Sequence, residues 1–435
     1  MALGGGTFVT QNKELPGAYI NFISAASANA NLSDRGYATM PLELDWGVDG
    51  EVFEVTNGDF QKNSMEIFGY EYSHDKLKGL RDLFKNTKTL YAYKLTSGGV
   101  KAANTYAEAL HGGIRGNDLK ITIQKNADDE TMFDVKTLMG TTAVDEQTVK
   151  TVAELAANKH VKWEPGATLA LTAATPLTGG TNGTADGAAH QAYLDKIESF
   201  TYNTMGVVVT DTVTKSLYTS FNQRLRDEMG IKFQLVVYRE AADYYGTINV
   251  KNKTTDADWS EASLVYWVTG VSAGCEVNKS NQNKVYDGEF TVDVALTQTE
   301  LKKAIRAGEF TFHKVGSDIR VLEDINSMVT TSDTCGDIFK DNQTIRVIDQ
   351  IANDIAVLFN TKYLGVVPND NAGRTSLWSD IVKHHQQLNE IRAIESFADS
   401  DISVAQGNTK KSVVVTDAVT VVNAMGKLYM TVTVA

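Results

Sequence analysis

One motif in the sequence has the residue types and spacing of a catalytic nucleophile. Gly270-Val-Ser272-Ala-Gly274 matches the G-x-S-x-G nucleophile elbow of α/β-hydrolases, in which a strand, a sharp turn and a helix hold the serine. A strand-like apolar run over 264–268 precedes it. The histidines placed in a suitable chain order are His111, His313, His384 and His385. The helix that should follow is missing, because 275–284 has no apolar stripe and is rich in asparagine. We therefore interpret 270–274 as a tight turn of small residues, with an esterase that uses Ser272 as the alternative.

No other pattern points to a cofactor or a metal ion. The P-loop pattern is absent, and the glycines of 112–116 lack the strand-to-helix setting of a dinucleotide fingerprint. His384 and His385 are adjacent, so on a helix they point about 100° apart and cannot both face one ion. We interpret them as part of a solvated helix surface. Cys275 and Cys335 are isolated, which gives no zinc site. The sequence thus predicts no cofactor and no work driven by nucleotide hydrolysis.

Length and charge exclude several classes of protein. A chain of 435 residues is too long for one ordinary core, so two to four domains are expected. A net charge of −13 argues against nucleic-acid binding, which needs a clustered basic face. No uninterrupted apolar run approaches the length of a membrane span, so we expect no direct membrane insertion.

Helical and strand patterns alternate along most of the chain, which predicts an α/β architecture. The predicted strands are 37–44, 88–95, 205–210, 232–238, 264–268, 285–294, 310–322, 412–416 and 419–422. The predicted helices are 75–86, 188–200, 212–228, 299–307 and two long ones, 345–359 and 377–397. Rich in threonine, glycine and short alternating runs, residues 98–183 read as a β-rich insert with one short helix over 148–157. A cluster of turn residues over 178–183 ends this insert.

The last ten residues, 426–435, carry a clear strand pattern. One face would hold Leu428, Met430, Val432 and Val434, and the other Tyr429, Thr431 and Thr433. A strand needs a neighbour for its backbone groups, and an unpaired edge tends to pair with another molecule. The segment therefore either folds back into its own domain or pairs in trans by strand addition.

The N-terminal residues have the composition of an arm. Gly4-Gly5-Gly6 cannot hold a fixed conformation alone, and 18–23 is strand-like. Either this end is a flexible arm that becomes ordered against another element, or it simply frays. We accordingly divide the chain into an N-terminal arm 1–24, a first part of the α/β core 25–97, the insert 98–183, a continuation of the core 184–330, a helical part 331–411 and C-terminal strands with an arm 412–435.

Several short segments, taken in order, resemble one protein family. They are Leu15-Pro-Gly-Ala-Tyr19-Ile-Asn-Phe22, Arg35-Gly36, 267–274, 278–280, 286–288, 304–310, 321–327 and 424–434. Together they resemble the contractile tail sheath proteins of phage tails and of R-type tail bacteriocins of Gram-positive bacteria. Gly426 stands where the family often has a larger, acidic residue, which would loosen the entry to the last strand.

This resemblance implies a structural subunit rather than an enzyme. The implied fold is α/β and multidomain, with a C-terminal α/β core that carries two long helices and extended terminal arms, plus a β-rich outer insert. The arms would join a sheet of a neighbouring subunit. Their implied interface residues are Leu428, Met430, Val432, Val434, Tyr19 and Phe22. Glycines 4–6 and residues 401–411 have a composition that suits hinges beside the arms.

The resemblance also implies partners and a place of action. The partners are further copies of this chain, a tail tube protein, and baseplate and tail terminator proteins. One of the two long helices would line the tube. Arg346, Lys383 and Arg392 are then either tube contacts or ordinary solvated positions. The product would be a virion or bacteriocin tail, assembled in the bacterial cytoplasm and released on lysis. Another self-assembling tail or surface-layer protein remains the alternative outside enzymes.

Overall fold

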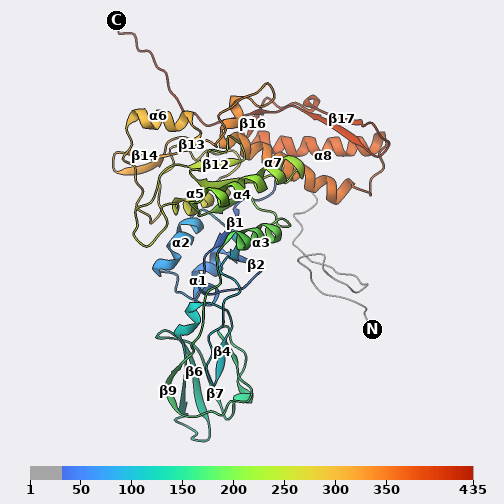
Figure 1. Ribbon diagram of the computed structural model, residues 1–435. Helices are drawn as coiled ribbons and strands as arrows, with labels where there is room; N and C mark the ends of the chain where they lie inside the picture. The colour runs from blue at the N-terminus through green and yellow to red at the C-terminus, as the bar shows by residue number, and fades with distance from the viewer. Residues whose placement is uncertain (1–31, 435) are drawn as a thin grey trace.

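A seven-stranded sheet forms the centre of the chain, which the computed structural model describes from residue 32 to residue 434 (Figure 1). Its strands lie in the order β13-β12-β11-β10-β1-β3-β2. Their bounds are β1 Tyr37–Leu42, β2 Val52–Thr56, β3 Thr89–Lys94, β10 Thr204–Val207, β11 Gln234–Tyr238, β12 Thr247–Val250 and β13 Glu309–Phe310. All neighbours run parallel except β2, which pairs antiparallel with β3. The sheet thus joins residues from both sides of the predicted insert.

Helices cover both faces of this sheet, as a parallel sheet requires. One face packs against α1 Asn57–Phe68, α2 Lys78–Phe84 and α5 Leu264–Gly274. The other packs against α3 Gly187–Ile197 and α4 Thr212–Gln223, which continues as a π-helical turn over Arg224–Glu228. Every residue of β10, β11 and β12 is buried, which explains why these strands are apolar without alternation. The α/β fold class is confirmed.

The G-x-S-x-G segment lies in helix α5, so the predicted strand over 264–268 and the predicted turn are wrong. A short, fully apolar run cannot be assigned to strand or helix by periodicity, and here it is a buried helix. The two glycines serve packing. A Cβ on Gly270 would lie 2.3 Å from the carbonyl oxygen of Leu83, and one on Gly274 would lie 1.8 Å from that of Asn86. Small residues therefore let α5 lie against the end of α2.

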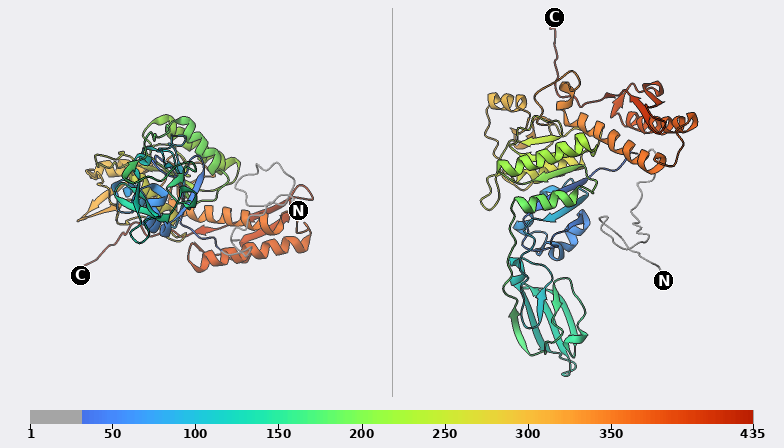
Figure 2. Two further views of the ribbon diagram at one scale, coloured as in Figure 1. Left: turned by 90° about the horizontal axis from the view of Figure 1, so that it is seen from below. Right: turned by 45° about the vertical axis from the view of Figure 1, so that its right-hand side comes forward.

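The insert is a separate β-rich part at one end of the molecule (Figures 1 and 2). A four-stranded antiparallel sheet has the order β7-β6-β5-β9, and β4 pairs with β8. The bounds are β4 Ala107–Ala109, β5 Leu119–Lys125, β6 Phe133–Met139, β7 Thr142–Val149, β8 Val161–Trp163 and β9 Thr172–Pro176. The predicted helix over 148–157 is wrong, because this segment completes β7 and then forms one 3-10 turn, Val152–Glu154.

Two glycines let backbones touch where the insert joins the sheet. A Cβ on Gly99 would lie 2.0 Å from the carbonyl oxygen of Thr181, and one on Gly183 would lie 1.9 Å from that of Ser97. The two segments that form this neck are also hydrogen-bonded, because the amide of Gly183 donates to the carbonyl of Thr96 at 2.9 Å. The glycine cluster at 178–183 is thus a packed junction.

The segment 285–321 extends from the α5 side of the sheet. It contains α6 Gln298–Arg306, β13 and the hairpin of β14 Phe312–Val315 with β15 Asp318–Val321. Thr297 caps α6 in a capping box with Glu300. The predicted strand over 285–294 is wrong, since only isolated bridges at Val285 and Val292 occur there.

Two long helices and two small sheets form the C-terminal part (Figure 1). The bounds are α7 Asn342–Leu358, α8 Asn371–Glu390, β16 Ile394–Glu395, β17 Ile402–Gln406, β18 Val413–Asp417 and β19 Thr420–Val421. A π-helical turn, Phe359–Tyr363, ends α7. Within 401–411, the segment suggested as a hinge, residues 402–406 form β17, which packs on α8. Arg226 ties α7 to the central part through two hydrogen bonds of 2.7 Å to Asp349.

Candidate subunit interface

Residues 425–434 leave the body of the molecule as an extended segment (Figures 1 and 2). The exposed fractions of the predicted apolar face are 84% for Leu428, 73% for Met430, 67% for Val432 and 88% for Val434. The segment makes no hydrogen bond within the described range and belongs to no strand there. It does not fold back onto its own chain, so the alternating apolar face has no cover within residues 32–434.

The β17–β18 sheet is the part of the described chain best suited to receive another strand. It contains two antiparallel strands, and within residues 32–434 each has the other as its only partner. One face packs on α8, where the indole Nε1 of Trp378 donates to the carbonyl of Ile402 at 3.0 Å. Val414 and Val415 of β18 remain half-exposed. Among the described residues, an unpaired backbone edge is therefore left on either side of a sheet whose inner face is already supported.

Two adjacent histidines of α8 are buried and contact carboxylates of other elements. Their interpretation as part of a solvated helix surface is therefore wrong. His384 is 1% exposed, and its Nε2 lies 2.9 Å from the Asp354 carboxylate. His385 is 0% exposed, and its Nε2 lies 3.0 Å from the carboxylate of Asp417 in β18. The two side chains do point to different partners, as adjacent helix positions must. Within residues 32–434 no group of three or more His, Cys, Asp or Glu is arranged to hold a metal ion.

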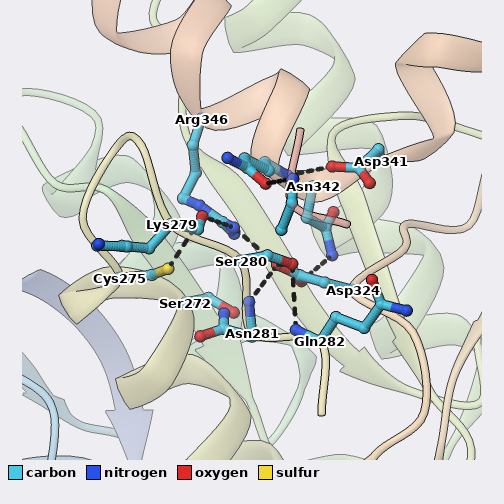
Figure 3. A network of polar contacts seen from close by, with 12 residues as sticks. Ser272, Cys275, Lys279, Ser280, Asn281, Gln282, Asp324, Asp341, Asn342 and Arg346 are labelled. Atoms are coloured by element: carbon cyan, nitrogen blue, oxygen red, sulfur yellow. Dashed lines mark hydrogen bonds and ion pairs between the residues drawn. The ribbon is translucent and has the colours of Figure 1, made fainter. Parts of the chain in front are cut away.

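Arg346 lies inside the protein, in a polar network at the first turns of α7 (Figure 3). Its Nη2 donates to the Asp324 carboxylate at 2.7 Å and to the carbonyl of Lys279 at 2.8 Å. The amide of Asn281 donates to the same carboxylate at 2.8 Å. Burial disfavours the charge of Arg346, but the facing Asp324 outweighs this, and the pKa of Arg346 is raised. The predictions of Arg346 as a tube contact or as a solvated position are therefore wrong, because its guanidinium is buried and is not accessible to a partner protein.

The remaining predicted contact residues lie in different settings. Lys383 on α8 and Arg392, just after that helix, are exposed and stay candidates for a partner surface. Arg392 has a φ of +59°, so it occupies a turn rather than the helix. Tyr19 and Phe22, like the whole predicted N-terminal arm, lie outside the described residues.

Ser272 cannot act as a nucleophile in this fold. Its side chain is 0% exposed, and its hydroxyl has no hydrogen-bond partner that could remove the proton. Its carbonyl and that of Cys275 instead accept hydrogen bonds from Arg35, at 3.2 and 2.8 Å, at the end of α5. Burial and the charge of Arg346 lower the pKa of Arg35 to about 10. The esterase alternative is therefore wrong.

Four family models match the chain in succession and together span nearly all of it. They are the Gp18 domain III N-terminal region of tail sheath proteins at 35–95, the phage tail sheath β-sandwich domain at 87–182, the central domain at 183–327 and the C-terminal domain at 335–435. The phage-like element PBSX protein XkdK of Bacillus subtilis is 31% identical, over 99% of this chain and 100% of that protein. The chain belongs to the phage tail sheath family.

Solved structures agree with this membership. A sheath tail protein from Desulfitobacterium hafniense is 36% identical and has a TM-score of 0.78, over 90% of this chain and 93% of that one. The helical sheath of the anti-feeding prophage in its contracted state has the same fold, with a TM-score of 0.57 at 11% identity over 97% of this chain and 99% of that one. The family is structural and not enzymatic. None of the described helices is long and apolar enough to cross a membrane.

Sequence reasoning singled out the exposed C-terminal segment of this sheath protein but missed the candidate acceptor. The run Val413-Val414-Val415 is a strand signal, yet nothing in it says that the edge stays unpaired. The polar side chains that hold the start of the exposed segment also gave no signal, because they lie on α7 and far from it in sequence.

Proposed function

We propose that this protein polymerises into a contractile tail sheath by strand addition between subunits. Residues 426–435 of one subunit would pair with an open edge of the β17–β18 sheet of a neighbour. The observation that carries the proposal is the combination of an uncovered, alternating apolar face and an unpaired two-stranded sheet in one chain. Backbone pairing would supply affinity, and pockets for alternate side chains would supply register.

Burial of the apolar face would supply part of the energy of this pairing. Fully burying one side chain such as leucine, methionine or valine is worth about 1.5–3 kcal/mol. Leu428, Met430, Val432 and Val434 all start from an exposed state. Ordering the segment opposes this gain, because each residue fixed costs about 1–2 kcal/mol, so the backbone hydrogen bonds of the added strand must contribute as well. The same connection would be repeated at every subunit of the polymer.

Contraction would proceed from a long, metastable state to a short, more stable one. The sequence has no P-loop, so the driving energy would be stored when the sheath assembles. Each subunit would move nearly as a rigid body, with bending confined to the connecting segments. The packed neck at Gly99 and Gly183 and the buried pair of Arg226 with Asp349 support this, because they fix the parts of the subunit to one another.

The partners follow from this role. The sheath would surround a tail tube protein, start at a baseplate and end at a terminator protein, in the tail of a virion or of an R-type bacteriocin. Contraction would drive the tube through a cell envelope. Assembly would take place in the bacterial cytoplasm, with release on lysis. Lys383 and Arg392 are the exposed cations proposed for tube contact.

Deleting residues 426–435 tests the proposal. The truncated chain should keep the unfolding free energy of the full chain, because the deleted residues make no hydrogen bond to the described body. It should remain a monomer in sedimentation and form no sheaths in electron micrographs. The full chain, expressed in parallel, is the control. Sheaths of normal length from the truncated protein would show that strand addition by this segment is not the means of assembly.

A further inference from the structure

Two buried glutamines of α7, Gln343 and Gln350, each bind the backbone of a segment that leads toward one end of the chain. Their exposed fractions are 2% and 4%. They are seven residues apart, which is two helical turns, so they lie on the same face of α7 and about 10 Å apart along its axis. This arrangement places the starts of both terminal segments on one rigid element.

Gln343 pairs with the departing C-terminal segment as a neighbouring strand would. Its Nε2 donates to the carbonyl of Val422 at 3.0 Å, and its Oε1 accepts from the amide of Ala424 at 2.9 Å. The carbonyl of one residue and the amide two residues later point to the same side of an extended chain, so one carboxamide can bind both. The side chains of Thr344 and Asn423 add a contact of 3.2 Å.

The last backbone bond of the body lies immediately before this contact. The amide of Val422 donates to the carbonyl of Ala393 at 3.0 Å, continuing the pairing of β19 with β16. With residues 32–434 as possible partners, Ala424 is bound through Gln343 alone, and the segment from Met425 to residue 434 makes no hydrogen bond. Gln343 is therefore the last group that determines the direction in which the segment leaves.

Gln350 does the same for the other terminal segment. Its Nε2 donates to the carbonyl of Ser33 at 3.2 Å and to its Oγ at 2.6 Å. Asp354, one turn further along α7, accepts from the Oγ of Ser33 at 2.5 Å and from its amide at 3.3 Å. His384 holds Asp354 from the side of α8. The first described residues are thus fixed to both long helices.

We propose that Gln343 and Gln350 are positioning residues: Gln343 fixes the point from which the C-terminal segment leaves the subunit, and Gln350 fixes the first described residues against α7. Gln343 sets the direction and the first pairing residue of the C-terminal segment, and bending begins at Met425. Because Gln343 and Gln350 both lie on α7, rotation of a subunit moves together the two points that they hold. This inference rests on the proposed strand addition and identifies the residues that orient the C-terminal segment for it.

The substitutions Gln343→Ala and Gln343→Glu in the full-length protein test this role. In the isolated Q343A subunit, hydrogen exchange of the Ala424 amide should rise at least tenfold, while the thermal midpoint stays within a few degrees of wild type. The yield of sheaths in electron micrographs should fall at least tenfold. Glutamate keeps an acceptor for Ala424 but places an oxygen against the carbonyl of Val422. Q343E should therefore lose assembly while the Ala424 amide stays more protected than in Q343A.

Gln386→Ala is the matched control, since Gln386 is an exposed glutamine of α8 whose Nε2 binds only Asp399. It should assemble as wild type does. Two results with Q343A would overturn the proposal: normal assembly although the Ala424 amide exchanges freely, or lost assembly although that amide is as protected as in wild type. If Q343A fails to fold, Thr344→Val gives the same comparison, with a smaller rise in exchange of about threefold. Sheath formation by the 426–435 deletion would instead refute the proposed function itself.

Discussion

The central seven-stranded sheet and the β17–β18 sheet meet the hydrogen-bonding needs of their backbones in opposite ways. The central sheet is covered by helices on both faces, and its middle strands are buried at every position. The β17–β18 sheet is supported by α8 on one face and has two unpaired edges within the described chain. An open edge is a liability that proteins normally blunt with lysine, proline or a covering element.

The difference separates stability from assembly. The central sheet contains most of the apolar core, so the folding of the subunit depends on it. The β17–β18 sheet contributes little core, and in our proposal it is completed by another subunit. The same contrast holds within the last part of the chain. Each residue of 422–424 is hydrogen-bonded to the described body, whereas residues 425–434 make no hydrogen bond to it. Changes in the two regions should therefore have separable effects.

Substituting a core residue should give the largest effect and should act on both properties. Trp267 of α5 is 0% exposed, packs against Tyr286 and Phe312, and donates from its indole nitrogen to Asp287 at 2.7 Å. Trp267→Ala should lower the free energy of unfolding by about 3–5 kcal/mol, because it leaves a cavity. Denaturant unfolding measures this change. Assembly should fall only in proportion to the folded fraction, and lost assembly by a fully stable W267A would contradict the separation.

Blunting the open edge should give the next largest effect, on assembly alone. Val414 of β18 is 52% exposed, so Val414→Lys should change the free energy of unfolding by no more than about 0.5 kcal/mol. The lysine should reduce the yield of sheaths at least tenfold, because charged edge residues block strand addition. Val100→Lys is the matched control, since Val100 is 57% exposed and lies in the β-rich insert, outside its strands. Equal yields from V414K and V100K would exclude the β18 edge as the acceptor.

The same contrast explains how much the sequence could predict. Amphipathic elements such as 188–200, 212–228 and 345–359 were recovered as α3, α4 and α7, because each has one apolar and one polar face. The segment 264–274 was not, because a helix that is apolar all round has no periodic signal. Arg346 was misjudged for a related reason. Its charge suggested the surface, and only the tertiary fold brings Asp324 to it.

The candidate interface was also only partly predictable from the sequence. Alternation in 426–435 is local, so the sequence showed which residues share a face. The glutamine contacts join residues 79 and 81 positions apart, and the proposed acceptor lies in another subunit, so no local pattern reports either. A glutamine inside an amphipathic helix looks like any polar position until the segment that it binds is in place.

The pH dependence of subunit stability should give the smallest effect and should be confined to the central part. Asp82 of α2 is 0% exposed, and burial raises its pKa to about 6, although the hydroxyl of Tyr286 and the amide of Glu289 both donate to it. The folded state therefore binds this proton more tightly than the unfolded state, whose aspartate titrates near 4. The resulting stabilisation is present at low pH and is lost as the pH rises through 6.

Between pH 5 and pH 7 this group should lower the free energy of unfolding by about 1 kcal/mol. Asp82→Asn removes the titration, so the change in unfolding free energy over that range should differ between wild type and D82N by this amount. Denaturant unfolding at both pH values measures it, and identical pH profiles would contradict a raised pKa at Asp82. Because Asp82 lies on α2 and its partners lie within 286–289, hydrogen exchange of the Ala424 amide should show no corresponding difference between the two proteins. A change there would mean that the central part and the exit of the segment are coupled, which the separation of stability from assembly does not allow.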